Sequence, residues 1–147
     1  MEPVSSTNSY PGENASAFAI VQLGNAYYNA AMELFKHASA PDPLSFAPAR
    51  LCAIHAIELY LNAVLRHEGV APSQIRGRMH NLADPTFFTR LKLRKKTADH
   101  LQALTERREY LIARYAPEQA SQHTELNRLT ATLVEVMMKA GHYVSNP

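Results

Sequence analysis

Hydrophobic and polar positions along the chain follow the three-and-four spacing of amphipathic helices, and no stretch alternates with the period of two that marks a strand. After a candidate cap at Asn14 or Ser16, apolar residues wind one stripe down a helix that reaches His37. The stripe consists of Phe18, Val21, Tyr28, Met32 and Phe35. The pattern predicts an all-α fold whose first helix covers residues 14–37.

Prolines divide the rest of the chain, because each one resists a helix interior. Ser45, shortly before Pro48, predicts the start of a second helix that continues to Glu68 and ends at Gly69. This segment is apolar nearly all round. We therefore expect it to be the central and most buried element.

Three further helices are predicted by the same signals. Asp84 before Pro85 starts a short helix, and Thr97 and Ser121 can open two longer ones. We expect these helices to end at Arg94, before Pro117 and at Gly141. The predicted architecture is an up-and-down antiparallel bundle of four long helices plus a short fifth helix. Residues 14–143 would form this single domain, and residues 1–13 a flexible or disordered polar arm.

Composition also indicates the class of protein and the cellular compartment to expect. The 147 residues are 46% hydrophobic, which is enough for one complete core, and the net charge is only +2. No apolar run approaches the ~18 residues that a membrane-spanning helix needs, so we expect no membrane association. A single cysteine, Cys52, lies among apolar neighbours and suits a reducing compartment. These features predict a cytoplasmic protein.

Polar residues on faces that should be apolar are the candidate functional groups. His55, Glu58 and Asn62 line one edge of the second helix, with Arg66 four residues further on. Arg108 falls on the apolar stripe of residues 97–116. The simplest arrangement is an ion pair between Arg108 and Glu58. Such a pair is explained either by helix register alone or by a ligand-binding or catalytic role.

The seven histidines invite a metal hypothesis, but the sequence favours no metal site and no cofactor. His55 and Glu58 have helical ligand spacing, yet the order His-x-x-Glu occurs once and no second helix supplies a matching pair. We expect most of the other histidines to face solvent or to cap helices. They are His37, His67, His80, His100, His123 and His142.

Eight of the 15 basic residues lie between Arg66 and Lys96. Within this basic stretch, Arg94, Lys95 and Lys96 end the segment RLKLRKK, and two phenylalanines, Phe87 and Phe88, come just before it. Cations beside aromatic rings are typical of sites for nucleotides or single-stranded nucleic acid. A solvated helix end is the alternative explanation.

Three segments together resemble HEPN-domain proteins, small helical bundles found beside nucleotidyltransferases and in toxin–antitoxin and defence systems. AIHAIELYLNAVLRHEG (residues 53–69) looks like the second long helix of that family, and LIARYAPE (residues 111–118) looks like its Ala-Arg-Tyr-Pro helix end. RMHNL (residues 78–82) resembles its Gly-His-Asp-Leu turn, with Met79 in the Gly place. The resemblance covers roughly residues 15–141.

Catalytic members of that family are metal-independent ribonucleases with an Arg, then a His, and often a Tyr two positions later. Arg108 and Tyr115 fill the Arg and Tyr places, but Ala113 stands in the His place. The usual proton-transfer group is therefore absent from this helix, and His80 in the preceding turn is the remaining candidate. The resemblance thus implies a non-catalytic member.

We therefore predict a HEPN-like module, a homodimer by resemblance, that binds a nucleotide, an RNA-like anionic ligand or a nucleotidyltransferase-type partner. Arg108, Tyr115 and the basic stretch would contact the ligand, and the second-helix residues would organise the site. An alternative is a diverged metal-independent endoribonuclease or toxin with Arg108, Tyr115 and His80 as its catalytic candidates. A third is a purely structural interaction domain.

Overall fold

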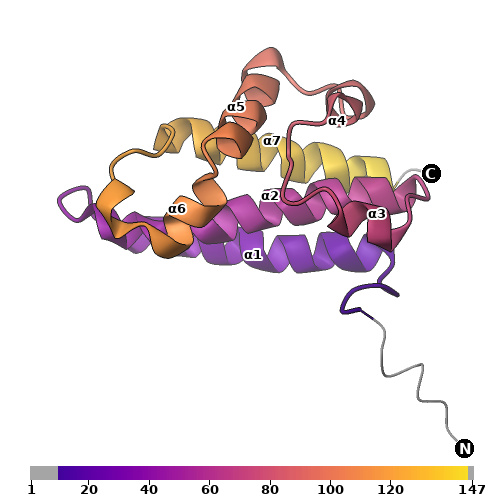
Figure 1. Cartoon of the computed structure of the whole chain (residues 1–147), viewed down its shortest axis with the longest axis horizontal. Coiled ribbons are helices and arrows are strands. Elements are labelled where there is room, and N and C mark those ends of the chain that lie inside the picture. The colour runs from indigo at the N-terminus through magenta and orange to yellow at the C-terminus, as the bar shows by residue number, and fades with distance from the viewer. Residues whose placement is uncertain (1–9, 146–147) are drawn as a thin grey trace, which may run out of the picture.

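The computed structural model describes residues 10–145, and the regular structure within this range is helical, as the hydrophobic pattern predicts. Three long helices lie side by side and form the body of the molecule (Figure 1). They are α1 (Ala17–His37), α2 (Ala47–His67) and α7 (Leu126–Ser145). The prediction of an all-α fold is confirmed.

Helix α2 is the central element, as its nearly uniform apolar composition predicts. Its buried residues contact both α1 and α7, and Ile57, Tyr60 and Val64 are fully buried. Ser16, one of the two candidate caps of α1, accepts a hydrogen bond from the Ala19 N–H at 3.0 Å. Gly69 follows the end of α2 with a φ of +87°, the left-handed conformation that favours glycine.

Ser45 does not cap α2, although its position favours that role. Its hydroxyl accepts the Ser39 N–H at 2.8 Å and donates to the Asp42 carbonyl at 2.6 Å. These contacts close the hairpin between α1 and α2, and a short 3₁₀ turn, η2 (Pro43–Phe46), leads directly into α2.

The segment after α2 contains two short helices, α3 (Pro72–Arg76) and α4 (Pro85–Arg90). Asp84 caps α4 by accepting the Thr86 N–H at 2.8 Å, so the predicted start is confirmed. The predicted end at Arg94 is wrong. Lys92 has a φ of +52°, which turns the chain away from the helix axis before α5 begins.

The predicted long helix over residues 97–116 is broken into α5 (Lys95–Glu106) and α6 (Glu109–Tyr115). The expectation of four long helices is therefore wrong for this segment. A 3₁₀ turn, η3 (Pro117–Gln119), follows α6, and residues 120–125 between it and α7 are not helical. Helix α7 consequently begins after the candidate cap Ser121, and it continues past Gly141.

Contacts between distant residues establish the directions of the helices. Asn25 meets Tyr60, and Arg66 near the end of α2 meets Ala15 just before α1, so α1 and α2 are antiparallel. His100 meets Thr132, and Thr97 meets Glu135, so α5 passes α7 in the opposite sense. The carboxyl ends of α2 and α7 meet where Tyr143 donates to Glu68 at 2.5 Å. Helices α2 and α7 thus run in one direction and α1 runs in the other, and α5 is steeply inclined to the three of them (Figure 1).

The predicted N-terminal arm lies mostly outside the described residues. Its last residues contact the body: the Arg76 guanidinium lies over the Tyr10 ring, 4.1 Å from the centroid, and 3.8 Å from the Glu13 carboxylate.

Within the described part of the chain, Pro43–His67 is long and apolar enough to cross a membrane by length and composition, with a mean hydropathy of 1.2. The expectation that no segment meets this measure is therefore wrong. The segment contains α2, and 44% of its apolar window is buried inside the molecule. The core helix of a soluble protein passes the same test, so the segment is weak evidence for a membrane span.

Candidate functional site

The chain bends sharply where α5 meets α6, and this bend decides which residue faces the core. Arg108 has a φ of +53°, a left-handed backbone conformation that interrupts the helix. A continuous helix would place Arg108 on the apolar face, but the bend exposes it and buries Glu109 completely. The prediction of an inward Arg108 is wrong, and so is its pairing with Glu58.

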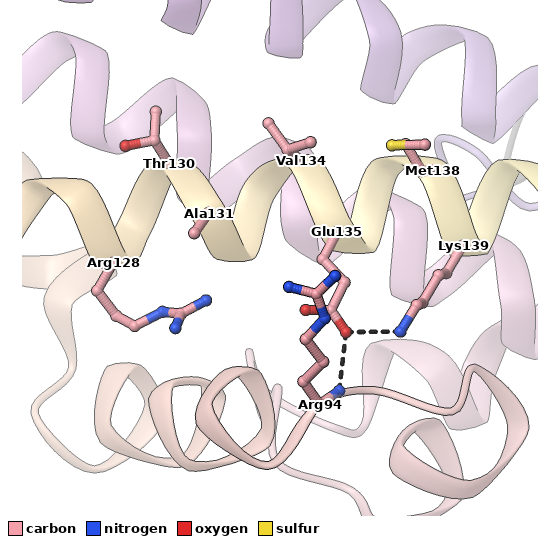
Figure 2. A pocket seen from close by; sticks show the side chains of 8 residues that line it. All are labelled: Arg94, Arg128, Thr130, Ala131, Val134, Glu135, Met138 and Lys139. Atoms are coloured by element: carbon pink, nitrogen blue, oxygen red, sulfur yellow. Dashed lines mark hydrogen bonds and ion pairs between the residues drawn. The ribbon is translucent and has the colours of Figure 1, made fainter.

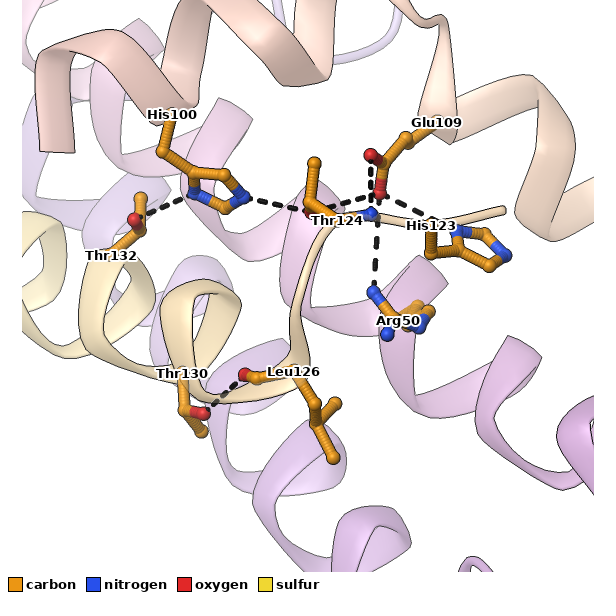
Figure 3. A network of polar contacts seen from close by, with 8 residues as sticks. All are labelled: Arg50, His100, Glu109, His123, Thr124, Leu126, Thr130 and Thr132. Carbon is orange, nitrogen blue, oxygen red and sulfur yellow. Dashed lines mark hydrogen bonds and ion pairs between the residues drawn. The ribbon is translucent and has the colours of Figure 1, made fainter. Parts of the chain in front are cut away.

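Glu109 is the centre of a buried polar network (Figure 3). Its carboxylate accepts the Thr124 N–H at 2.9 Å and the Thr124 hydroxyl at 3.2 Å. It also lies 3.4 Å from His123 Nδ1 and 3.9 Å from Arg50 Nη1. Burial raises the pKa of Glu109, but the hydrogen bonds from His123 and Thr124 outweigh it and leave the pKa below its ordinary value. The core therefore holds a charged carboxylate.

His100 extends this network from α5 to α7. Its Nδ1 lies 2.7 Å from the Thr132 hydroxyl, and its Nε2 lies 2.9 Å from the Thr124 hydroxyl. Burial lowers the pKa of His100 to about 4, so the ring is neutral at pH 7. His100 is buried, and the His123 side chain is only 4% exposed, so the expectation of solvent-facing histidines is wrong for both.

Arg50 supplies the positive charge of the network from the first turns of α2. Burial lowers its pKa, and Glu109 partly offsets that effect. Its buried Nη1 has no hydrogen-bond partner. Arg50 and Glu109 therefore form the buried ion pair that the sequence predicted between Arg108 and Glu58. Fixing helix register is a sufficient explanation for such a pair.

Glu58 pairs with His80. The Nδ1 atom of His80 lies 3.0 Å from each carboxylate oxygen of Glu58, and its ring stacks on Tyr110 of α6 with centroids 4.5 Å apart. Met79 and His80 both have positive φ, at 53° and 67°, so the turn holds a strained backbone to present this ring. A carboxylate at Nδ1 fixes the imidazole tautomer and orients Nε2, an arrangement suited to proton transfer.

His55 lies near this pair on α2. It meets the Tyr27 ring edge-on, with centroids 4.5 Å apart. Burial lowers its pKa, Glu58 opposes that shift, and the charge of Arg114 on α6 adds to it. Two residues of the polar edge predicted on α2 therefore interact with α6. Glu58 does so through His80, which stacks on Tyr110, and His55 does so through the charge of Arg114.

Two other residues of that polar edge have different surroundings. Asn62 lines, together with His55, an apolar hollow of about 490 Å³ between α1, α2 and α3. Arg66 donates to the backbone carbonyls of Ala15 and Val70, at 3.3 and 3.5 Å. Arg66 thus ties the start of α1 to the end of α2.

Arg108 and Tyr115, the residues singled out by the family resemblance, line one surface hollow of about 310 Å³ with Arg107. Tyr115 is 72% exposed. A neighbouring hollow of about 520 Å³ shares Arg107 and extends over polar side chains. These are Gln119, Ser121, Gln122 and His123. No carboxylate occurs among the described residues that line either hollow.

The basic stretch lies elsewhere. Helix α5 is about 18 Å long and separates Arg94, at its amino end, from Arg108. Lys96 is exposed, and Lys95 pairs with Asp99 at 2.8 Å. The sequence grouped these cations with Arg108, but the structure separates them.

The two phenylalanines that precede RLKLRKK do not offer a stacking surface. Phe87 is fully buried beneath the guanidinium of Arg78, and Phe88 packs against the core. Arg94 does not lie beside these rings. It faces α7 and lines a hollow with Arg128 and Lys139 (Figure 2).

Sequence reasoning missed the buried network and the α7 cations. One signal was available: His100 lies three residues after Thr97 and four before Leu104, on the apolar face of α5. Nothing in the spacing indicates that Glu109 replaces Arg108 on the inner face.

No group of three or more His, Cys, Asp or Glu side chains in residues 10–145 is placed to hold a metal ion. Comparison of the chain with protein-family models, curated proteins and solved structures found no match.

Proposed function

We propose that this chain is a non-catalytic HEPN-like module that binds a nucleotide or a short RNA-like ligand at the surface hollow formed by Arg107, Arg108 and Tyr115. The observation that carries the proposal is the composition of this hollow, in which two guanidinium groups and an exposed aromatic ring meet without a lining carboxylate. Guanidinium groups neutralise phosphates, and an exposed ring stacks on a base.

The proposal includes the HEPN-like architecture. In it α5 and α6 together take the place of the third long helix, running opposite to α2 and α7, so that the four segments form an up-and-down bundle. It also includes self-association of the chain as a homodimer or pairing with a nucleotidyltransferase, since the resembling family dimerises through the helices that carry these residues.

Titration with AMP, ADP and a fluorescein-labelled oligouridine at low salt tests the proposal. Arg108→Ala is expected to weaken binding about tenfold or more, and Tyr115→Ala to weaken it by a similar factor, because stacking contributes about 1–3 kcal/mol per base. Lys36→Ala is the matched control, since Lys36 is an exposed cation on α1. Absence of binding, or equal binding by the parent and by Arg108→Ala, would contradict the proposal.

A second candidate is a diverged metal-independent endoribonuclease, and the pairing of Glu58 with His80 favours it. In this case His80, oriented by Glu58, would act as the proton-transfer group that Ala113 cannot supply. The assay is cleavage of structured and unstructured RNA in the presence of EDTA. Loss of cleavage in both His80→Ala and Arg108→Ala would support an enzyme, whereas no cleavage by the parent protein would exclude this candidate.

A further inference from the structure

Helix α7 carries a second apolar stripe in addition to the one that faces the core. Leu129, Leu133 and Val136 are fully buried on the inner side. On the outer side, Ala131, Val134 and Met138 follow one another at helical spacing, and Met138 is 62% exposed. A helix that is apolar on both sides needs a partner for the outer side, or leaves apolar surface in water.

This outer side is hollowed along its length. One hollow of about 540 Å³ is lined by the apolar stripe together with Arg94 and Arg128. A second hollow of about 570 Å³ continues past Met138 and Lys139, which line both, to Tyr143. We call the two together the α7 groove. Arg128 and Tyr143 are 15 positions apart on the helix, so the groove is about 22 Å long, enough for roughly four turns of a second helix.

The rim of the α7 groove is basic. Its lining cations are Arg90, Lys92, Arg94, Arg128 and Lys139, of which Arg90 pairs with Glu68 at 2.7 Å and Lys139 with Glu135 at 2.8 Å. Glu135 is the one carboxylate among the described lining residues, and it is already engaged. It accepts the Arg94 N–H, the Thr97 hydroxyl and the Lys139 ammonium at 2.8, 2.5 and 2.8 Å. An occupant therefore meets an apolar row with a basic row running beside it.

Figure 2 shows how these two properties are arranged. Val134 and Met138 lie in a row along one side of α7, and Arg128 and Lys139 extend from its other side toward Arg94. Arg128 donates to the Thr97 hydroxyl at 3.2 Å rather than to a carboxylate, so its charge is not neutralised by an ion pair there. The apolar row and the basic row are parallel.

We propose that the α7 groove docks an amphipathic helix of a partner protein, with aliphatic side chains against Val134 and Met138 and acidic side chains opposite Arg94, Arg128 and Lys139. Apolar anchors at helical spacing in a groove are a common mode of helix recognition, and methionine adapts to varied apolar partners. Opposite charge along the rim would fix the register of the docked helix and speed association.

Charge and floor composition decide against two other occupants. A second copy of this chain would bring Lys92, Arg94 and Arg128 onto the same three cations if the groove paired with itself, and such like-charge contact is unfavourable. Single-stranded nucleic acid uses aromatic stacking surfaces. The floor at Ala131, Val134 and Met138 is aliphatic, and the aromatic residue at the far end, Tyr143, has its hydroxyl bound to Glu68.

The test uses the full chain and a synthetic fluorescein-labelled 18-residue peptide with leucines at helical spacing flanked by glutamates. We expect saturable binding, measured by fluorescence anisotropy, that weakens as salt is raised. Met138→Asp should weaken it about tenfold or more, and Arg128→Glu should do the same. Met79→Asp is the matched control, because Met79 is 76% exposed and does not line the groove.

Two further peptides and one RNA complete the design. A peptide of the same composition with its leucines scattered, and one with lysines in place of the glutamates, should bind at least about tenfold more weakly. The proposal is overturned if the acidic peptide shows no saturable binding up to about 1 mM, or if the scattered peptide binds equally well. It is also overturned if oligouridine alone occupies the groove and is lost in Met138→Asp, or if Met138→Asp dissociates a dimer in sedimentation.

The inference does not depend on nucleotide binding at Arg108. Arg108→Ala should leave peptide affinity unchanged, and Met138→Asp should leave nucleotide affinity unchanged. Each experiment therefore fails separately, which distinguishes a wrong assignment of the α7 groove from a wrong proposed function.

Discussion

Arg108 and Glu109 are neighbours in the chain, yet one is exposed and the other is fully buried. The left-handed backbone at Arg108 produces this reversal, since it changes the phase of the helix between the two residues. The consequence is chemical as well as geometric. The arginine is available to an anionic ligand at the surface, and the glutamate is committed to Arg50, His123 and Thr124 inside the molecule.

Glu109→Gln is expected to destabilise the fold by about 3 kcal/mol, because it leaves Arg50 as an uncompensated buried charge. The amide keeps the size of the side chain, so cavity formation does not contribute. The measurement is the free energy of unfolding in urea at pH 7. Glu106→Gln, three residues earlier on the exposed side of α5, should change it by less than about 0.5 kcal/mol.

The double variant Glu109→Gln with Arg50→Met should recover part of the loss, since it removes the charge that the single variant strands. If the single variant is as stable as the parent, the pair does not hold α6 against α2.

At the scale of elements, α1 packs directly against the Tyr60 ring of α2 at Gly24. A Cβ on Gly24 would lie 2.9 Å from Cε1 and 3.1 Å from Cδ1 of the Tyr60 ring, which is fully buried. The Tyr60 hydroxyl donates to Asn25 Oδ1 at 2.6 Å, so the ring is held at its far end and cannot swing aside. The absence of a side chain at Gly24 sets the spacing of the two helices.

Gly24→Ala is therefore expected to destabilise the protein by about 1 kcal/mol. Overpacking costs about 1–3 kcal/mol, and the better helix propensity of alanine returns up to about 1 kcal/mol. Gly141→Ala in α7 is the matched control, because no atom beyond the adjoining residues and backbone of its own helix lies within 4 Å of its Cβ position. It should stabilise the protein by about 0.5–1 kcal/mol in the same urea measurement. Equal stabilisation by both changes would show that Tyr60 can move.

The sequence predicted most of the elements but not all of their limits. Local signals located α1 and α2 well, because Ser16 is a side-chain cap and Gly69 supplies a positive φ. They failed between α5 and α6, where the apolar stripe continues through Arg108 although the helix does not. Burial of Glu109 against Arg50 is a long-range interaction, and helical periodicity carries no record of it.

At the scale of the whole molecule, sequence spacing selected several candidate residues but paired them wrongly. Glu58 was assigned to Arg108, and the structure gives it to His80. Arg108 and Tyr115 do share a hollow, although at the surface. Polar residues can be selected from one sequence because they interrupt an apolar pattern, whereas their partners depend on how α2, α5 and α6 pack.

The buried network also sets how the stability of the whole molecule depends on pH. His100 has a pKa of about 4 in the fold, against 6.5 for an ordinary histidine. Between these values the unfolded chain binds a proton that the folded chain does not, so stability increases with pH in this window and is complete above about pH 6.5. The pKa of Glu109 is lowered, so its contribution is present above its ordinary pKa of 4.5 and is lost as the pH falls further.

Urea unfolding at several pH values between about 4.5 and 7.5 isolates the histidine contribution. The parent should lose stability on the order of 3 kcal/mol as the pH falls toward 4, since each unit of pKa shift is about 1.4 kcal/mol. His100→Gln cannot take up that proton, so its stability should change less steeply with pH, whatever its stability at pH 7. His37→Gln replaces an exposed histidine at the end of α1 and should keep the slope of the parent. If the slopes of the parent and of His100→Gln coincide, the link between α5 and α7 through His100 does not control the response to acid.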